Sequence, residues 1–507
     1  MRTGEPGSRR VGGAFRQASG GVLLAAVMAA PWMYGSTRHW AIVVLCWMLS
    51  AGVLLWGIGV GLGGLSGQRI PGFRWVGYPV LFLMLGGWLV VLAGPALPPE
   101  PFTTEHARML MQRWPGSFVV KTPAETMWLF SGLLGALLIV VDLSAQRRWW
   151  MAIYTVTALT GASIVLLGLV QIQMGARAIL WQSDVPNTGN FFATYFHHSV
   201  AGAFINLVWP LAAGRFLFDL TRTDQDLGRR IGASVFWGLM LLVGLSGPLA
   251  QVSRVAHLNA FVLLVMFAGC AIWRRTSRDR ARFILRIFGA AVALTLVIGT
   301  VAGGFGRLPE IGARWRLFVK PSEKSTVSLV MRPDGFIAAS ESSGFFGARK
   351  IAAITCLRMI PSAGLLGFGP GSWAATYPHF TDDPLLRTFF LHVQFAHVDW
   401  LQTVVEWGIL GAVAWGILIV GGLWRAAQSL RCRPTEASKV DPPGSMVAGA
   451  VIALIGVLLH ALIDFPMQIP SIQLYFIVTL GLAWTSLHRV QASSSANRRT
   501  ERSGNPE

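Results

Sequence analysis

Ionisable side chains within or beside long apolar stretches are the first candidates for chemistry in this sequence. An ionisable group near membrane depth is costly to place and is usually functional. The candidates are Arg177, His197, His198, Arg254, His257, Arg349, His392, His397, Asp399, Glu406, His460 and Asp464. Arginines can hold a phosphate, while histidines and carboxylates can accept or orient a proton. These residue types suggest acid–base chemistry on an anionic substrate at one face of a membrane.

The arginines are candidate anion ligands. Arg254 stands in GLSGPLAQVSRVAHLNA, at the end of an apolar stretch. Its guanidinium either extends to lipid head groups or binds a phosphate through two parallel N–H donors, a bidentate contact that lysine cannot make. Arg349 and Lys350 open a segment of helical character, where they form either a solvated face or part of an anion site. Arg177 is a further candidate for substrate binding.

A second group lies in FLHVQFAHVDWLQTVVEWGILG, which contains His397, Asp399 and Glu406. A histidine there acts either as an interfacial hydrogen-bonding residue or as a general base, since imidazole titrates near neutral pH. Asp399 and Glu406 are expected to orient the histidine or its helix and to contribute to substrate binding. His392 and His397 with Asp399 lack a clear third ligand at metal spacing, so we expect no metal site.

The remaining candidates are two histidines and one carboxylate. His197 and His198, in TYFHHSVAGAF, either line the same cavity or cap a helix. Asp464, in LLHALIDFPMQIPS, is expected to pair with an arginine and fix helix packing. The sequence contains no phosphate-binding loop, dinucleotide fingerprint or nucleophile elbow in a supporting context. Chemistry driven by a nucleotide is therefore not expected.

Membrane-spanning helices must position these residues. Of the 507 residues, 53% are hydrophobic and 13% are charged, whereas soluble domains have roughly 25% charged residues. The apolar residues form repeated blocks long enough to cross a bilayer. The predicted spans lie near 19–36, 39–61, 76–96, 124–143, 150–174, 196–214, 231–250, 255–273, 286–305, 400–424, 446–465 and 470–487. The expected fold is an all-α, polytopic membrane protein with about 12 spans.

The net charge of +19 gives an orientation rather than a nucleic-acid partner. Alternate short turns are basic, and by the positive-inside rule these face the cytoplasm together with both termini. The basic residues include Arg9, Arg10, Arg16, Arg69, Arg74, Arg147, Arg148, Arg215, Arg222, Arg229, Arg230, Arg274, Arg275, Arg425 and Arg431. Contact with anionic membrane lipids accounts for the charge, so no nucleic-acid binding is expected.

The predicted organisation has five parts. A basic cytoplasmic N-terminus occupies residues 1–18, spans one to nine occupy 19–305, and spans ten to twelve occupy 400–487. Between them, residues 306–399 are too long and too polar for a connector and predict a folded periplasmic loop with short helices. In that loop a helix runs from Ala348 to Ile360 and stops at Pro361, before a glycine-rich turn. The cytoplasmic tail 488–507 is expected to be disordered.

Three stretches of the chain resemble the bacterial O-antigen ligase and O-antigen polymerase superfamily of membrane glycosyltransferases. GARKIAAITCLRMIPSAGLLGFGPGSW resembles its arginine-led loop helix, and AHVDWLQTVVEWGILG resembles its histidine-led re-entry motif. LSGPLAQVSRVAHL resembles its Ser-Arg element, and the likeness extends over roughly residues 150 to 485. The chain departs from the family at Val398, where asparagine is usual, and at Val255, where glycine is usual. HHSVAG also replaces an asparagine-rich element.

The resemblance implies an enzyme of the bacterial inner membrane that needs no cofactor. Its donor would be a glycan on undecaprenyl diphosphate, and its acceptor a hydroxyl of another glycan or of the lipid A core. Arg254 and Arg349 would hold the diphosphate, and His397 would take the proton of the attacking hydroxyl. Asp399, Glu406, His198, Arg177 and Lys350 would contribute to substrate binding.

A transporter or flippase for an anionic solute or a lipid-linked sugar is the alternative from another functional class. Transporters usually bind their cargo near the middle of the bilayer on broken helices. The candidate residues of this chain instead cluster near one rim and in the large loop. This placement favours chemistry on a membrane-anchored substrate.

Overall fold

The computed structural model describes residues 6–63, 73–93, 121–182, 191–222, 226–273, 289, 329–331, 337–339, 347–380, 395–432 and 444–503. Nine helices in these ranges are long and apolar enough to cross a membrane. They are α1 (Pro6–Trp32), α2 (His39–Gly63), α3 (Phe73–Leu92), α5 (Lys121–Leu143), α6 (Arg147–Gln173), α7 (His198–Thr221), α8 (Leu227–Ala250), α15 (Asp399–Arg431) and α17 (Pro470–Ser503). The shorter apolar helices α9 (Arg254–Trp273) and α16 (Gly444–His460) join the bundle. The fold is that of a polytopic helical membrane protein.

Hydrophobic block length predicted the helices well. Every predicted span overlaps one of these helices except 286–305, which lies outside the described residues apart from position 289. Most of the loop 306–399, including His392, is likewise outside them. The helix α17 continues to Ser503 where we expected a disordered tail, because no glycine or proline interrupts the chain between Gly481 and Gly504.

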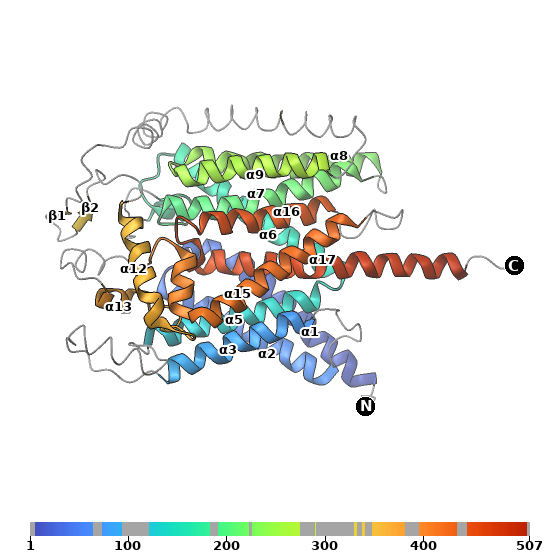
Figure 1. Ribbon diagram of the computed structural model, residues 1–507. Coiled ribbons are helices and arrows are strands. Elements are labelled where there is room, and N and C mark those ends of the chain that lie inside the picture. Colours follow the sequence, from blue (N-terminus) through green and yellow to red (C-terminus); the bar gives the residue numbers. More distant parts are fainter. Residues whose placement is uncertain are drawn as a thin grey trace.

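The bundle has two ends with different contents (Figure 1). Both termini lie at one end, and the short elements α12 (Gly347–Ala363), α13 (Trp373–Thr376), β1 (Leu329–Met331) and β2 (Ile337–Ala339) lie at the other. We call the latter the site end. The two strands, of three residues each, pair antiparallel with Val330 opposite Ala338 and are a small addition to the predicted all-helical fold. The sequence between them contains Pro333, Asp334 and Gly335, which favour a turn.

The helices α7 and α17 form the centre of the bundle. In each, 94% of the most apolar window is buried, against 28% in α2 at the periphery. Glycines bring α7 and α16 into close contact, since a Cβ at Gly449 would lie 2.5 Å from the carbonyl oxygen of Pro210. Small residues serve this purpose in membrane helix pairs. The first turn of α7 is therefore fixed firmly against the end of α16.

A lid, residues 347–380, covers the site end and has its own apolar core. Cys356, Met359, Trp373 and Tyr377 are buried there with Val405 of α15. Burial raises the pKa of the Cys356 thiol to about 12, so this cysteine stays protonated and packs as a core residue. The lid is therefore a folded structure rather than a loose connection.

The helix that opens the lid is longer than predicted. We expected Pro361 to stop it, but α12 continues through Pro361 to Ala363. Its end comes at Gly364, whose φ of +62° is the left-handed conformation typical of the residue after a helix. The predicted glycine turn is confirmed: φ is positive at Gly364, Gly367, Gly369 and Gly371.

The glycine turn of the lid is inserted into a break in α15. Gly408 has φ 65° and ψ −178°, a conformation that glycine alone adopts readily. Backbone hydrogen bonds join the two segments, from the N–H of Gly369 to the carbonyl of Glu406 and from the N–H of Leu410 to the carbonyl of Leu365. The turn thus satisfies backbone groups that the break leaves open.

Substitution of Gly408 by alanine is expected to destabilise the protein by about 2 kcal/mol or more. A Cβ there would lie 2.4 Å from the Gly367 nitrogen and from the Leu365 carbonyl oxygen. Thermal unfolding in detergent measures the effect. Gly416→Ala in the same helix is the control, because its Cβ would meet no atom within 4 Å. Equal stability of the two variants would contradict the prediction.

Candidate functional site

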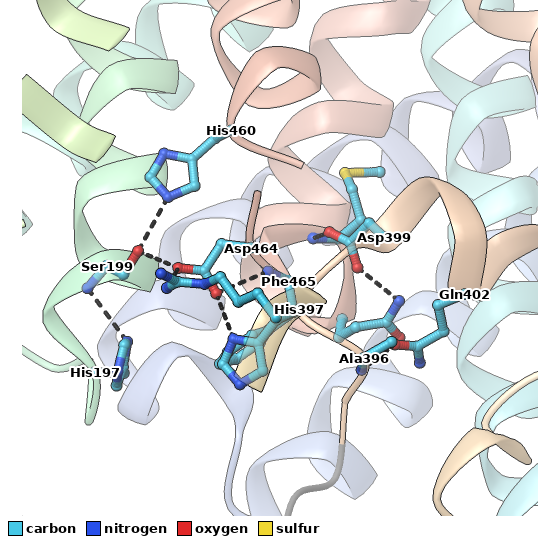
Figure 2. A network of polar contacts seen from close by, with 12 residues as sticks. His197, Ser199, Ala396, His397, Asp399, Gln402, His460, Asp464 and Phe465 are labelled. Atoms are coloured by element: carbon cyan, nitrogen blue, oxygen red, sulfur yellow. Dashed lines mark hydrogen bonds and ion pairs between the residues drawn. The ribbon is translucent and has the colours of Figure 1, made fainter. Parts of the chain in front are cut away.

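The carboxylate of Asp464 is the centre of a polar cluster at the site end (Figure 2). Asp464 lies between α16 and the short helix η6 (Pro466–Gln468), and its side chain is 1% exposed. Its Oδ1 accepts hydrogen bonds from His397 Nδ1 at 3.0 Å and from the Phe465 N–H at 3.1 Å. Its Oδ2 accepts from Arg349 Nη2 at 3.3 Å and from the Ser199 hydroxyl. We call Ser199, Arg349, His397, His460 and Asp464 the Asp464 cluster.

Segments distant in the sequence bring this cluster together. Ser199 is the second residue of α7, Arg349 is the third residue of α12, and His397 stands two residues before α15. The N-termini of three helices therefore lie around one carboxylate. Their partial positive charges add to that of the Arg349 guanidinium and favour an anion at this end of the bundle.

These donors keep Asp464 ionised. Burial alone raises the pKa of its carboxyl, but the hydrogen bond from His397 and the nearby positive charge of Arg349 outweigh burial and hold the pKa far below its ordinary value. The cluster thus contains a fixed negative charge beside the histidine and the arginine.

The depressed pKa of Asp464 predicts a pH-dependent stability. Its contribution is fully present above the ordinary carboxyl pKa, near pH 4, and is lost as the pH falls toward the folded-state pKa. The difference in unfolding free energy between the wild type and Asp464→Asn should therefore be largest at neutral pH. It should shrink below about pH 4. Thermal unfolding in detergent measures it, and a difference that does not change with pH would contradict the prediction.

His397 has the geometry of a general base. Its Nδ1 faces a carboxylate oxygen that can only accept, so Nδ1 carries the hydrogen and the neutral ring has its lone pair on Nε2. The ring packs edge-on against Phe465 at 4.6 Å, and 27% of the side chain is exposed. A carboxylate that fixes the tautomer of a partly exposed histidine is the arrangement that general-base catalysis needs.

A chain of hydrogen bonds from α15 holds the turn that carries His397. The backbone φ of His397 is +56°, which costs a residue with a side chain free energy. Gln402 Oε1 accepts from the N–H of the preceding Ala396 at 2.9 Å, and Gln402 Nε2 donates to Glu406 Oε1 at 3.0 Å. The same Glu406 oxygen accepts from the Trp373 N–H of the lid. Glu406 thus ties the lid to the histidine turn, as the expected orienting role requires.

Asp399 has a similar structural position. Its carboxylate, in a residue that is 2% exposed, accepts from the Met467 N–H at 2.7 Å and from Gln468 Nε2 at 2.9 Å. It therefore anchors η6, the helix that follows Asp464, to the start of α15. This geometry orients the two sides of the site. It also turns the carboxylate toward η6, so the metal arrangement with His397 that we considered has no support in the described contacts.

Arg349 points its fork at the cluster from the first turn of α12. One amino group bonds Asp464 Oδ2, and the side chain is 21% exposed. A guanidinium has five N–H donors, so the side-chain type suits contact with a carboxylate and with an anion together. The residues predicted for base and anion binding, His397 and Arg349, therefore meet on one carboxylate.

The structure distributes the other predicted residues along the same end. Arg254 is the first residue of α9, and His198 is the first residue of α7, where its ring stacks on His197 at 4.6 Å. Arg177 is exposed in the segment after α6. Lys350 lies in α12 beside Arg349 in sequence, and the structure does not describe its side chain. The described contacts of Asp464 include none of these four.

Sequence reasoning missed the central role of Asp464 and the participation of Ser199. It expected Asp464 to pair with an arginine, and Arg349 is that partner, but the same carboxylate also holds the histidine. His460 was a candidate without an assigned role. A useful signal was available in the spacing of His460 and Asp464, which places two ionisable groups one turn apart at the end of an apolar stretch.

A cavity of about 110 Å³ extends along α15 into the bundle, and its described lining includes Ala461 and Asp399 but no member of the Asp464 cluster. Asp399 and Gln468 line it at the site end, and Trp415, Ile419 and Ile477 line it deeper in the bundle. The cavity is thus polar near the cluster and apolar toward the interior.

Comparison with known proteins adds no assignment. No family model, curated protein or solved structure matches the chain. The function must therefore be argued from the site itself.

Proposed function

We propose that the protein is a membrane glycosyltransferase that transfers a glycan from an undecaprenyl-diphosphate carrier to an acceptor hydroxyl. The observation that carries this proposal is the contact of His397 and Arg349 with the two oxygens of Asp464. It sets a proton acceptor and an anion ligand side by side, as displacement of a diphosphate by a hydroxyl requires.

The reaction follows from these positions. The acceptor hydroxyl loses its proton to His397 Nε2 while its oxygen forms a bond to the anomeric carbon of the donor glycan. The bond from that carbon to the phosphate oxygen breaks, and its electron pair leaves with the carrier diphosphate. Arg349 offsets the negative charge that develops there, with Arg254 as a further anion ligand, and the helix N-termini around Asp464 act in the same sense. Transfer of the proton to the histidine supplies typically 10²–10⁴-fold of rate.

The membrane orientation in this proposal has both termini in the cytoplasm and the site end in the periplasm of a bacterial inner membrane. The positions of many arginines support it, because they lie in the turns and helix segments on the side of the termini. Described arginines in turns or at helix ends on that side are Arg10, Arg16, Arg147, Arg148, Arg215, Arg222, Arg229, Arg230, Arg425 and Arg431. With twelve spans, including 286–305, the whole loop 306–399 would be periplasmic.

The cavity beside α15 is suited to part of the hydrocarbon chain of a lipid-linked substrate. Its polar end lies beside Asp399, two residues from His397, and its deeper walls are aromatic and aliphatic. A chain inserted there would bring its diphosphate close to Arg349. Because such a chain already lies in hydrocarbon, close packing against these walls, rather than exclusion from water, would hold an inserted segment.

The direct test is transfer by the purified protein in liposomes. The donor is an undecaprenyl-diphosphate oligosaccharide with a labelled sugar, and the acceptors are lipid A core or a second donor molecule. We expect release of carrier diphosphate and a labelled product. A ladder of sizes would indicate a polymerase and a single larger product a ligase. No turnover with either acceptor, together with movement of the donor across the liposome membrane, would instead support a transporter or flippase. The break in α15 is the structural feature that favours this alternative, because transporters often use broken helices.

Substitution of Arg349 by lysine should impair transfer about ten-fold or more, because a point charge replaces a fork that bonds Asp464 and the diphosphate together. The loss should appear mainly in kcat if the contact strengthens as the leaving group gains charge. Steady-state kinetics with the labelled donor measure it. Arg358→Lys, on the same lid helix, is the control, since Arg358 is exposed. Unchanged kinetics in Arg349→Lys would remove Arg349 from the proposed mechanism.

A further inference from the structure

Two residues of the Asp464 cluster have no part in the reaction described above. Ser199 is 3% exposed and His460 is fully buried, so neither is placed to meet a substrate. The Ser199 hydroxyl contacts Asp464 Oδ2, and on its other side it lies 3.2 Å from His460 Nε2 (Figure 2). A line of three polar groups therefore runs from the core of the bundle to the site.

The direction of the hydrogen bonds in this line follows from the chemistry of the groups. A serine hydroxyl has one hydrogen, and an ionised carboxylate can only accept. The Ser199 hydrogen therefore points to Asp464, and His460 Nε2 must donate to the Ser199 oxygen. In the described part of the chain, His460 Nδ1 has no hydrogen-bond partner, which fits a neutral ring with its lone pair on Nδ1.

We propose that Ser199 and His460 are positioning residues that fix the rotation of the Asp464 carboxylate, so that Oδ1 is presented to His397 and Oδ2 to Arg349. This role rests on the proposed function. Without the serine, Oδ2 keeps only the longer bond to Arg349, and the carboxylate can turn toward the guanidinium. His397 then loses the partner that holds its tautomer.

The groups that face Asp464 come from every neighbouring element. Arg349 approaches Asp464 from α12, His397 from the turn before α15, and His460 from α16, while His197, just before α7, acts on His460. The serine donates to Asp464 through a hydroxyl, which carries no charge and does not titrate near neutral pH. Its removal therefore changes the geometry of the cluster without changing its formal charge.

Three variants test the proposal in the transfer assay. Ser199→Ala and His460→Leu should each lower kcat about ten-fold with little change in KM. The first removes a hydrogen bond to the Asp464 carboxylate, and the second removes the donor that holds the Ser199 hydroxyl in place. The acidic side of the kcat–pH profile should also shift, because the Asp464 carboxylate is no longer held in a fixed orientation toward His397. His460→Gln retains a donor near the position of Nε2 and should recover most of the activity. Ser246→Ala is the control, because this buried hydroxyl bonds only the Leu242 carbonyl of its own helix.

A thermodynamic cycle separates failure of this inference from failure of the proposed function. The unfolding stabilities of Ser199→Ala, Asp464→Asn and the double variant are compared in detergent. Non-additive effects, with a kcat loss that His460→Gln reverses, support the positioning role. Additive stabilities, or wild-type kcat and pH profile in both Ser199→Ala and His460→Leu, overturn it. If the wild type transfers no glycan, the proposed function fails, and the cycle still decides whether Ser199 acts on Asp464.

Discussion

Substitution of Asp464 by asparagine is expected to lower glycan transfer by about 10²–10⁴-fold. The carboxylate accepts hydrogen bonds from four donors. The NH₂ group of asparagine is itself a donor, so its two hydrogens would face some of these donors where an acceptor is needed. His397 would then receive a hydrogen bond on Nδ1 and carry its own hydrogen on Nε2, the atom that must accept the proton. The kcat for release of carrier diphosphate measures the loss, while donor binding reports how much of the arginine contact survives.

Asp219→Asn is the matched control for this change. Asp219 is also a buried aspartate of the bundle, 2% exposed, but it pairs with Arg215 on its own helix, far from the start of α7. This control variant should lose stability and keep its transfer activity once folded. If the two variants had the same activity per folded molecule, the Asp464 cluster would have no special role in the reaction.

Two substitutions of His397 should distinguish the loss of its imidazole as a base from the effect on the strained backbone of its turn. Asparagine tolerates the left-handed conformation of residue 397 better than alanine does. Both His397→Asn and His397→Ala should lower kcat by about 10²–10⁴-fold, because neither side chain accepts a proton near neutral pH. His397→Asn should nevertheless be the more stable of the two.

The measurements are kcat in liposomes and thermal unfolding in detergent, on samples matched for insertion into the membrane. Nearly full transfer by His397→Asn would show that the residue serves the turn rather than the chemistry. Loss of transfer in both variants, with a stable His397→Asn protein, would assign the loss to the missing imidazole.

The sequence was sufficient for the described membrane helices, and it singled out His397 and Arg349, which both contact Asp464. A span is read from a local property, the length of an apolar block, so the positions of α2 or α7 need no knowledge of their neighbours. His397 and Arg349 stand out because each has a chemistry-bearing side chain at the edge of such a block. Their convergence was an expectation from resemblance until the geometry placed both on one carboxylate.

Other features required the three-dimensional arrangement. Asp464 reads as a helix-packing residue because its partners His397 and Arg349 lie 67 and 115 positions away. The break in α15 is hidden because WGILGAVAWG is as apolar as any continuous span, and only the approach of the Gly367 backbone explains it. The strands and the helical tail were missed for a milder reason: short strands and helix ends depend on weak local preferences.

The insertion of the lid turn at Gly408 has a consequence for biogenesis. The lid is synthesised before α15, yet its glycine turn obtains several of its backbone hydrogen-bond partners from the halves of that later helix. Asp464 emerges later still, after α16. During synthesis, the early helices can therefore pack before the Asp464 cluster is complete. On the proposed function, transfer activity would begin only when the last helices enter the membrane, and truncated chains are expected to be inactive.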